Sequence, residues 1–214
     1  MLILGSMLSE QEADELRKEG VAWCLKAAEL GSTEAMLLVS MLYLEGRGVA
    51  KDLDQGNKWR QAAADRGDPD AMLNLALAHR DGVSAVRDAK KSVDWCRLGA
   101  LAGHGRSMYV LAQMYEQGEL LAKDPKQALE WYSKGAQLGD GPTLTQLGLI
   151  HAAGRETKKD ETAAAMFFRS AAEQNDPEGA YLLGRAYAEG RGLTQDDKEA
   201  ARWFHKAAFG NHTR

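Results

Sequence analysis

Residues 180–208 read AYLLGRAYAEGRGLTQDDKEAARWFHKAA, and this stretch decides the fold. Gly179, Leu183 and Tyr187 are spaced i, i+4, i+8, which places them on one face of a helix. Gly190 follows where a helix commonly ends in a left-handed residue, and Asp196 stands where a second helix can be capped. The stretch therefore predicts two helices joined by a short loop.

This pattern recurs every 36 residues along the 214-residue chain. An aromatic residue, a loop glycine and a capping aspartate each keep the spacing: Trp23, Trp59, Trp95, Trp131, Phe167 and Trp203; Gly46, Gly82, Gly118, Gly154 and Gly190; Asp52, Asp88, Asp124, Asp160 and Asp196. A fixed period of this length is typical of helical repeat proteins. We predict an all-α fold, a right-handed α-α superhelical solenoid of five 36-residue helix-turn-helix repeats preceded by an N-terminal helix.

We call the two helices of a repeat helix A and helix B. In the first repeat, helix A is expected over residues 33–45, with Gly46 as its C-terminal cap and Asp52 as the N-cap of helix B. Helix B carries the repeated tryptophan on its inner face, beside small residues that let neighbouring helices approach closely. The tryptophans expected to be largely buried between layers are Trp59, Trp95 and Trp131.

The repeat resembles the Sel-one-like repeat, a relative of the tetratricopeptide repeat. The fifth repeat carries the resemblance best, with Leu183-Gly184, Tyr187, Gly190-Arg191-Gly192-Leu193, Asp196 and Trp203-Phe204. The resemblance covers roughly residues 10 to 212 and implies the solenoid fold. It says little about function, because the family is a scaffold used for many partners. The departures are at the second loop glycine, which is replaced by Ser84, Leu120 and Glu156, and at Phe167, which replaces tryptophan.

The two ends of the chain differ from this pattern. Residues 1–9 are expected to form a flexible segment, because Gly5-Ser6-Met7 resembles a cloning junction, and residues 10–212 are expected to form a single repeat domain. The sequence has no apolar run of about 18 residues, which predicts no membrane insertion. The compartment stays open: cytoplasmic, or periplasmic or secreted if a signal peptide was removed.

The composition argues against a nucleic-acid partner. The net charge is -4 and the pI is about 5.8, whereas nucleic-acid binding needs a clustered basic surface. With 44% hydrophobic and 27% charged residues, the chain can bury a core.

Histidines and cysteines are interpreted as structural. His79 and His151 take the register position of Tyr43, Tyr115 and Tyr187, so each most simply replaces a partly buried tyrosine. Both pairs, the two histidines and Cys24 with Cys96, are two repeats apart. That separation is roughly 20 Å if layers advance 8–10 Å each. This distance excludes a shared metal and a disulfide, which needs Cα atoms within about 7 Å.

No catalytic arrangement stands out from the repeat background. Gly46-Arg47-Gly48 and Gly190-Arg191-Gly192 follow helices and recur by repeat, which favours capping turns over phosphate-binding loops. Some relatives in the resembled family have a cysteine pair in every repeat, and binding or hydrolysis of β-lactams has been ascribed to them. This chain lacks that spacing. We therefore expect no enzyme activity, no cofactor, no metal site and no catalytic residue.

The candidate binding surface is the side of helix A opposite the core. In the first repeat, residues 37 and 41 lie nearly opposite Ala35, Val39 and Tyr43. Two rows of register-equivalent residues follow, mostly apolar or aromatic where an ordinary surface helix is polar. The alternative is that successive helices A pack together and bury part of these rows. The predicted partner-binding residues are Leu37, Met41, Leu73, Leu77, Tyr109, Gln113, Leu149, Tyr181 and Arg185; Thr145 completes the rows.

These observations predict a scaffold or adaptor that binds a protein or peptide segment through a concave helix-A face. Acidic residues flank the rows and would favour a basic partner; they are Glu34, Glu45, Asp70, Asp81, Glu178 and Glu189. Two alternatives stay open: a dedicated inhibitor or immunity-type protein that neutralises one enzyme, and a hydrolase acting on β-lactam or cell-wall-like compounds. Ala207, Ala208 and Phe209 have no following layer, which predicts self-association, a covering tail, or an artificial end there.

Overall fold

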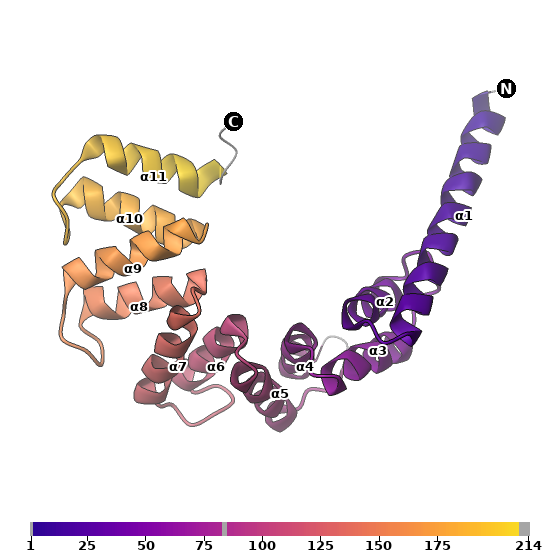
Figure 1. The fold of residues 1–214 in the computed structure, drawn as a ribbon, viewed down its shortest axis with the longest axis horizontal. Coiled ribbons are helices and arrows are strands. Elements are labelled where there is room, and N and C mark those ends of the chain that lie inside the picture. Colours follow the sequence, from indigo (N-terminus) through magenta and orange to yellow (C-terminus); the bar gives the residue numbers. More distant parts are fainter. Residues whose placement is uncertain (1, 83–84, 210–214) are drawn as a thin grey trace. The chain divides into compact units, whose positions relative to one another are not determined.

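The computed structural model describes residues 2–82 and 85–209, with side chains from Glu15 onward. Those residues form eleven helices and no strand, so the predicted all-α fold is confirmed. The helices are α1 (Leu2–Glu29), α2 (Thr33–Glu45), α3 (Leu53–Asp65), α4 (Pro69–Asp81), α5 (Ala89–Leu101), α6 (Gly105–Gln117), α7 (Pro125–Gln137), α8 (Gly141–Ala153), α9 (Glu161–Glu173), α10 (Pro177–Glu189) and α11 (Asp197–Phe209) (Figure 1).

Capping residues set the bounds of these helices. The backbone at Gly46 is left-handed, with φ of 73°, and its N–H donates to the Leu42 carbonyl. Asp52 begins α3, where its carboxylate accepts a 2.9 Å hydrogen bond from the backbone N–H of Gln55. The same two devices recur at 36-residue spacing because a helix end leaves backbone groups unsatisfied unless a cap supplies partners. The 36-residue period of the sequence therefore corresponds to the spacing of the helix-capping residues.

The loop of the fourth repeat keeps this geometry without a glycine. Glu156 occupies the position of Gly48 and Gly192 and takes a left-handed φ of 56°, against 73° and 69° for the two glycines. Cβ sterics make this conformation costly for a residue with a side chain, by about 1–2 kcal/mol. The loop thus has the same turn after the C-cap Gly154 as the loops with two glycines, and Glu156 adopts the left-handed conformation within it.

The chain divides into two compact units, Met1–Gly99 and Ala100–Arg214. In the first unit, α2 packs against α1 and α3, and α3 packs against α4. In the second unit, the pairs α6–α7, α8–α9 and α10–α11 follow one another, and helices A also contact each other, α6 with α8 and α8 with α10. The boundaries 1–9 and 10–212 stay a prediction; residues 2–9 are the first part of α1.

Each unit has its own apolar core between helices A and B. In the first unit it includes Met36 and Val39 of α2 and Ala63 and Ala64 of α3, with Trp59 packed against it. In the second it includes Phe168 of α9 and Leu183 of α10, with Trp203 packed against it.

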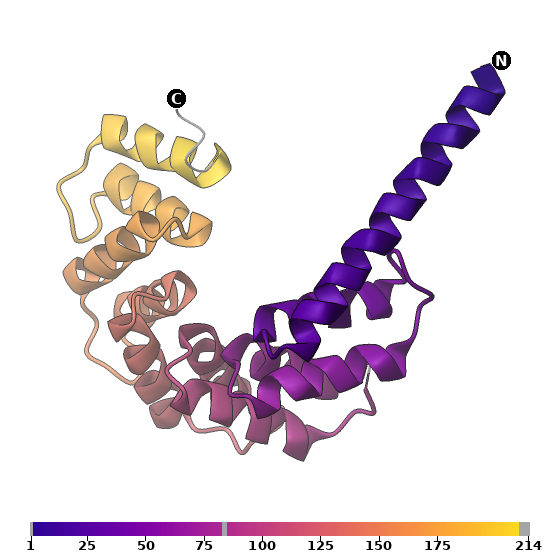
Figure 2. The same cartoon turned by 45° about the vertical axis from the view of Figure 1, so that its right-hand side comes forward.

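The repeated tryptophans differ in burial. Trp131 is 8% exposed, and Trp59 and Trp95 are half-buried, so only Trp131 is as enclosed as predicted. Trp23 of α1 is 62% exposed. Helix α1 explains this difference, because it continues as a single helix past α2 and α3 instead of turning back to form a helix A of its own (Figure 2).

Candidate functional site

The helix-A surface of the second unit is built around Tyr109. Its ring is half-buried and lies 6.0 Å from the buried ring of Tyr132 on α7, measured between centroids. One turn further along α6, the side-chain amide of Gln113 donates a 3.0 Å hydrogen bond to the Tyr109 hydroxyl. These two contacts hold Tyr109 in a fixed orientation beside Gln113.

The electrostatic environment of Tyr109 is negative. Partial burial raises the pKa of Tyr109, and the charges of Glu178, Asp176, Asp140 and Glu116 raise it further in the same direction. These four carboxylates, which lie on α6 and at the N-terminal ends of α8 and α10, thus disfavour an anion at this hydroxyl. The same field attracts a cationic group of a partner.

A second polar network lies behind Tyr109. The Tyr132 hydroxyl donates a 2.9 Å hydrogen bond to Glu116 Oε2, and the Arg155 guanidinium lies 3.2 Å from Glu116 Oε1. Burial, together with the hydrogen bond to Glu116, raises the pKa of Tyr132. Arg155 follows the next helix A along the chain, so Glu116 joins helix A of one repeat to the loop of the next.

The two predicted rows, of which the first starts at Leu37 and the second at Met41, each continue every 36 residues and differ in accessibility. In the first row, Leu73 is 5% and Thr145 1% exposed, whereas Tyr181 is 49% exposed. In the second row, Met41 is 39% exposed and the others are half-buried. The predicted residues lie in both units, with Leu37, Met41, Leu73 and Leu77 in the first and Tyr109, Gln113, Leu149, Tyr181 and Arg185 in the second.

Contacts between successive helices A account for the burial of the first row in the second unit. The Thr145 hydroxyl on α8 donates a 2.6 Å hydrogen bond to the Asp176 carboxylate, which also caps α10 through the N–H of Gly179. Thr145 therefore links two helices A and offers little to a partner. The second row is the more accessible of the two.

Among the flanking carboxylates, Glu45, Asp81 and Glu189 lie in surface ion pairs. Glu45 lies 3.4 Å from Arg47, Asp81 lies 2.7 Å from Arg80, and Glu189 contacts both Arg185 and Arg191. The hydrogen bond from Arg80 lowers the pKa of Asp81. Exposed pairs of this kind are weak, typically about 0–1 kcal/mol, so a cationic partner can compete for these carboxylates.

Sequence reasoning missed a groove that recurs at one register position. In the second unit it lies between helix B of one repeat and helix A of the next, and the loop after that helix A forms its end. At α7 and α8 its volume is about 450 Å³, and its lining includes Tyr132, Ile150 and Arg155. At α9 and α10 its volume is about 180 Å³, and its lining includes Phe168, Ala186 and Arg191. Phe168, Ala186 and Arg191 each lie 36 residues after Tyr132, Ile150 and Arg155, in that order.

Both grooves in the second unit have a third wall from the preceding helix A. Glu116 of α6 closes the groove at α7 and α8, and Leu149 and Ala152 of α8 close the groove at α9 and α10. Lys123 and Lys159, in the loops that follow these two helices, also line the grooves. With this third wall in place, the two grooves have the volumes of about 450 and 180 Å³ given above.

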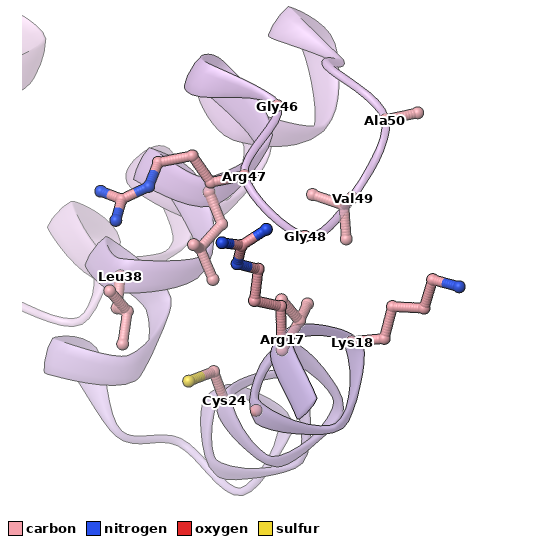
Figure 3. Close-up of a pocket in the computed structure, with 12 residues that line it drawn as sticks. Arg17, Lys18, Cys24, Leu38, Gly46, Arg47, Gly48, Val49 and Ala50 are labelled. Atoms are coloured by element: carbon pink, nitrogen blue, oxygen red, sulfur yellow. The ribbon is translucent and has the colours of Figure 1, made fainter. Parts of the chain in front are cut away.

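The first unit contains the same groove without that wall. It lies between α1 and α2, has a volume of about 800 Å³, and is lined by Cys24, Leu42 and Arg47 at the register positions of Tyr132, Ile150 and Arg155 (Figure 3). Figure 3 shows the Cys24 thiol directed toward Leu38 across the groove. We call this surface the α1/α2 groove.

A sequence signal for the open groove exists. Counting back 36 residues from Gly46, Gly48 and Asp52 gives Glu10, Glu12 and Leu16. The residues that stop helix A, turn the loop and cap helix B are thus absent there, and α1 passes straight through.

The histidine and cysteine predictions concern local contacts. His151 stacks on Phe167 with ring centroids 5.3 Å apart, and His79 Nδ1 lies 3.1 Å from the Val86 carbonyl oxygen. Both are half-buried, as expected for tyrosine replacements. Neither Cys24 nor Cys96 forms a disulfide, and burial raises the pKa of Cys96 to about 12.

The described part of the chain contains neither a metal-binding cluster nor a membrane-spanning helix. Among the described side chains, no group of three or more His, Cys, Asp or Glu residues could hold a metal ion. No helix in the described part of the chain is long and apolar enough to cross a membrane. Ser84 and the last five residues, where a covering tail was considered, lie outside the described residues.

The Sel1 repeat family model matches six segments, residues 4–32, 33–68, 69–104, 105–140, 143–176 and 177–211. The sequence predicts five repeats and a preceding helix; the sixth matched segment is that helix, which contains helix B of an incomplete repeat. A search of curated proteins finds no match.

Solved structures agree with the family match. A Sel1 repeat protein from Oxalobacter formigenes is 30% identical with a TM-score of 0.83, and the match covers 89% of this chain and 78% of that one. The protective antigen c5321 of uropathogenic Escherichia coli is 32% identical with a TM-score of 0.74; the match covers 87% of this chain and 40% of that one. The immunity protein Pa5087 of Pseudomonas aeruginosa, at 20% identity and a TM-score of 0.62 over 91% and 75% of the two chains, shares the fold.

The regular caps, the paired helices and six matched segments spanning most of the sequence agree with one another. The chain belongs to the Sel1 repeat family.

Proposed function

We propose that this chain is a protein-interaction scaffold that holds a basic segment of a partner protein on its helix-A side. Sel1 repeat proteins are in general non-enzymatic interaction scaffolds, which supports the broad class. The observation that carries the finer proposal is the electrostatic environment of Tyr109, a partly accessible aromatic side chain whose pKa is raised first by burial and then by the negative charges of four carboxylates.

The second row supplies the apolar contacts. Within the second unit, Gln113 and Leu149 are partly accessible and each lies on a helix A. Met41 and Leu77 are the corresponding candidates within the first unit, taken by itself. A few aromatic and apolar anchors usually provide most of the binding energy of an interface. Charged flanks mainly set orientation and association rate. Tyr109 is the anchor and the carboxylates around it orient the basic segment.

The test begins with a pull-down from the native lysate and mass spectrometry to identify the partner. Binding of that partner is then compared between the unmodified chain, Tyr109→Ala and Lys158→Glu, which alters an exposed loop position away from helix A. Tyr109→Ala should weaken binding by more than about 1 kcal/mol. Charge reversal at Glu34 or Asp81 should change mainly the salt dependence. Loss of binding in Lys158→Glu but not in Tyr109→Ala would place the functional surface on the loops.

The same experiment separates the alternatives. An enzyme that is captured and loses its activity would identify the chain as a dedicated inhibitor of the immunity type. Hydrolysis of a β-lactam or cell-wall-like compound by the purified chain would contradict the scaffold proposal.

Self-association through Phe209, which is 64% exposed at the end of α11, stays a prediction. Sedimentation of the Phe209→Gln variant, compared with that of the unmodified chain, tests it.

A further inference from the structure

The α1/α2 groove has the walls of a helix-binding site but no helix in it. In the second unit, each groove of this type is closed by residues of the preceding helix A. Within the described residues of the first unit, no helix takes that place, because α1 runs on as a single helix. Trp23 is 62% exposed, whereas its counterpart Trp131 is 8% exposed.

Gly20 is an independent observation that points to an occupant. A Cβ atom at Gly20 would meet nothing within 4 Å, although a glycine inside a helix costs about 0.5–1 kcal/mol relative to alanine. At Gly56, one repeat later, a Cβ would lie 2.7 Å from the Leu44 side chain of the repeat's own helix A. The other register counterparts are also small and buried: Ser92, Ala128, Ala164 and Ala200. A small residue at this position makes room for a closely packed helix A.

The charges at the groove specify the occupant. In the second unit, Glu116 near the C-terminal end of helix A meets Arg155 at 3.2 Å. Arg47, the counterpart of Arg155, lines the α1/α2 groove together with Arg17 and Lys18 of α1, and Lys18 is paired with Glu15 at 2.9 Å. The bond from Arg47 to Glu45 is long, 3.4 Å, and lies at the surface, so it competes weakly with a better placed carboxylate.

We propose that the α1/α2 groove binds an amphipathic helix of a partner protein, which takes the place of helix A. A small or apolar face of this helix lies on Gly20 and Trp23, and a carboxylate near its C-terminal end pairs with Arg47. Its length matches the other helices A, which are 13 residues long. A second copy of this chain cannot readily supply such a helix, because its own helices A are packed within their units. No residue of the two helix-A rows lines the α1/α2 groove, so the inference does not depend on the proposed function.

The chain itself provides the probe. A stapled peptide with the sequence of residues 104–118 contains helix A of the third repeat, including Glu116, and its binding to the full chain is measured by fluorescence polarisation. A staple on its solvent-exposed side is needed because isolated helices of this length are marginal in water. Binding should also slow maleimide labelling of Cys24, which lines the groove, while Cys96 is buried.

Three variants make the test specific. At Gly20 an added Cβ meets nothing within 4 Å, so Gly20→Leu places a larger side chain in the groove and should reduce peptide binding at least about tenfold. Arg47→Glu should do the same, and a peptide with Glu116→Lys should restore binding to Arg47→Glu but bind poorly to the unmodified chain. Lys58→Glu, an exposed change on α3 outside the groove, should leave binding unchanged.

The opposing results are distinct. A peptide that neither binds at millimolar concentration nor protects Cys24 from labelling would overturn the proposal. Equal binding of the peptide by the Gly20→Leu variant and by the unmodified chain would overturn it as well. A dimer of the unmodified chain that Gly20→Leu converts to a monomer, measured by light scattering, would assign the groove to a second copy instead. Circular dichroism of each variant establishes that a loss of binding does not reflect unfolding.

Discussion

Thr145 on α8 donates a 2.6 Å hydrogen bond to Asp176, the residue that caps α10. Because Asp176 also accepts from the N–H of Gly179, one carboxylate joins the middle of one helix A to the start of the next. A position that the helical wheel assigns to the outside of helix A is thereby part of the contact between layers.

Replacing Thr145 with valine should therefore lower stability and leave partner binding unchanged. Valine keeps the shape but leaves Asp176 with one hydrogen bond fewer, which costs about 1.5–3 kcal/mol for a bond to a charged group. Urea unfolding followed by circular dichroism measures the loss. A variant of normal stability with weakened partner binding would show that Thr145 belongs to the binding surface.

Leu73 and Leu77 should respond differently to aspartate. Leu73 is 5% exposed, so Leu73→Asp buries an unpaired carboxylate and should unfold the first unit or cost more than about 3 kcal/mol. The outward position of Leu73 on helix A predicts a tolerated surface change, whereas its burial predicts a loss of stability. Leu77 is half-buried on the same helix, and Leu77→Asp should keep the helical signal while weakening partner binding. Thermal unfolding monitored at 222 nm separates the two outcomes.

The buried thiol of Cys96 should make stability depend on alkaline pH. Burial raises its pKa from 9.0 to about 12, so in this range the unfolded chain releases a proton that the folded chain retains. The contribution of Cys96 to the free energy of unfolding is complete below pH 9. Between pH 9 and 12 it falls by up to about 1.4 kcal/mol per pH unit. Urea unfolding of Cys96→Ala should show a shallower decline over that range than the unmodified chain. Equal slopes would mean that Cys96 ionises freely in the folded state.

Glycine at position 156 should stabilise the second unit. Glu156 has a left-handed φ of 56°, and relief of that strain exceeds the extra entropy that glycine gives the unfolded chain. A net gain of about 0.5–1 kcal/mol corresponds to a rise in Tm of roughly 1–4 °C for a chain of this size. Glu156→Ala removes the same charge without relieving the strain and serves as the control. No difference between the two variants by calorimetry would show that the conformation is not strained.

Sequence reasoning succeeded wherever local physics decides the structure. The capping aspartate at Asp52 and the left-handed glycine at Gly46 act on backbone groups within a few residues, so their 36-residue spacing predicts where each helix begins and ends. The expected helix over residues 33–45 coincides with α2. The absence of a disulfide between Cys24 and Cys96 likewise follows from the repeat spacing.

The candidate site could be predicted only in part, because exposure depends on neighbours that are distant in sequence. Leu73 and Met41 occupy outward positions on their helices, yet the first is buried and the second is 39% exposed. A helical wheel gives the direction of a side chain but not what lies beyond it. Met41 therefore stays a candidate contact residue, whereas Leu73 does not.

By itself, the sequence determined the repeat, its period, the caps and the family, since each of these depends on residue type and spacing. Only the tertiary structure decided which rows pack between layers, which carboxylates surround Tyr109, and where a groove lacks its third wall. Those properties arise when residues one or more repeats apart come together, as Glu116 and Arg155 do. Packing, burial and electrostatic interaction act through space, and the chain alone does not specify which surfaces remain uncovered.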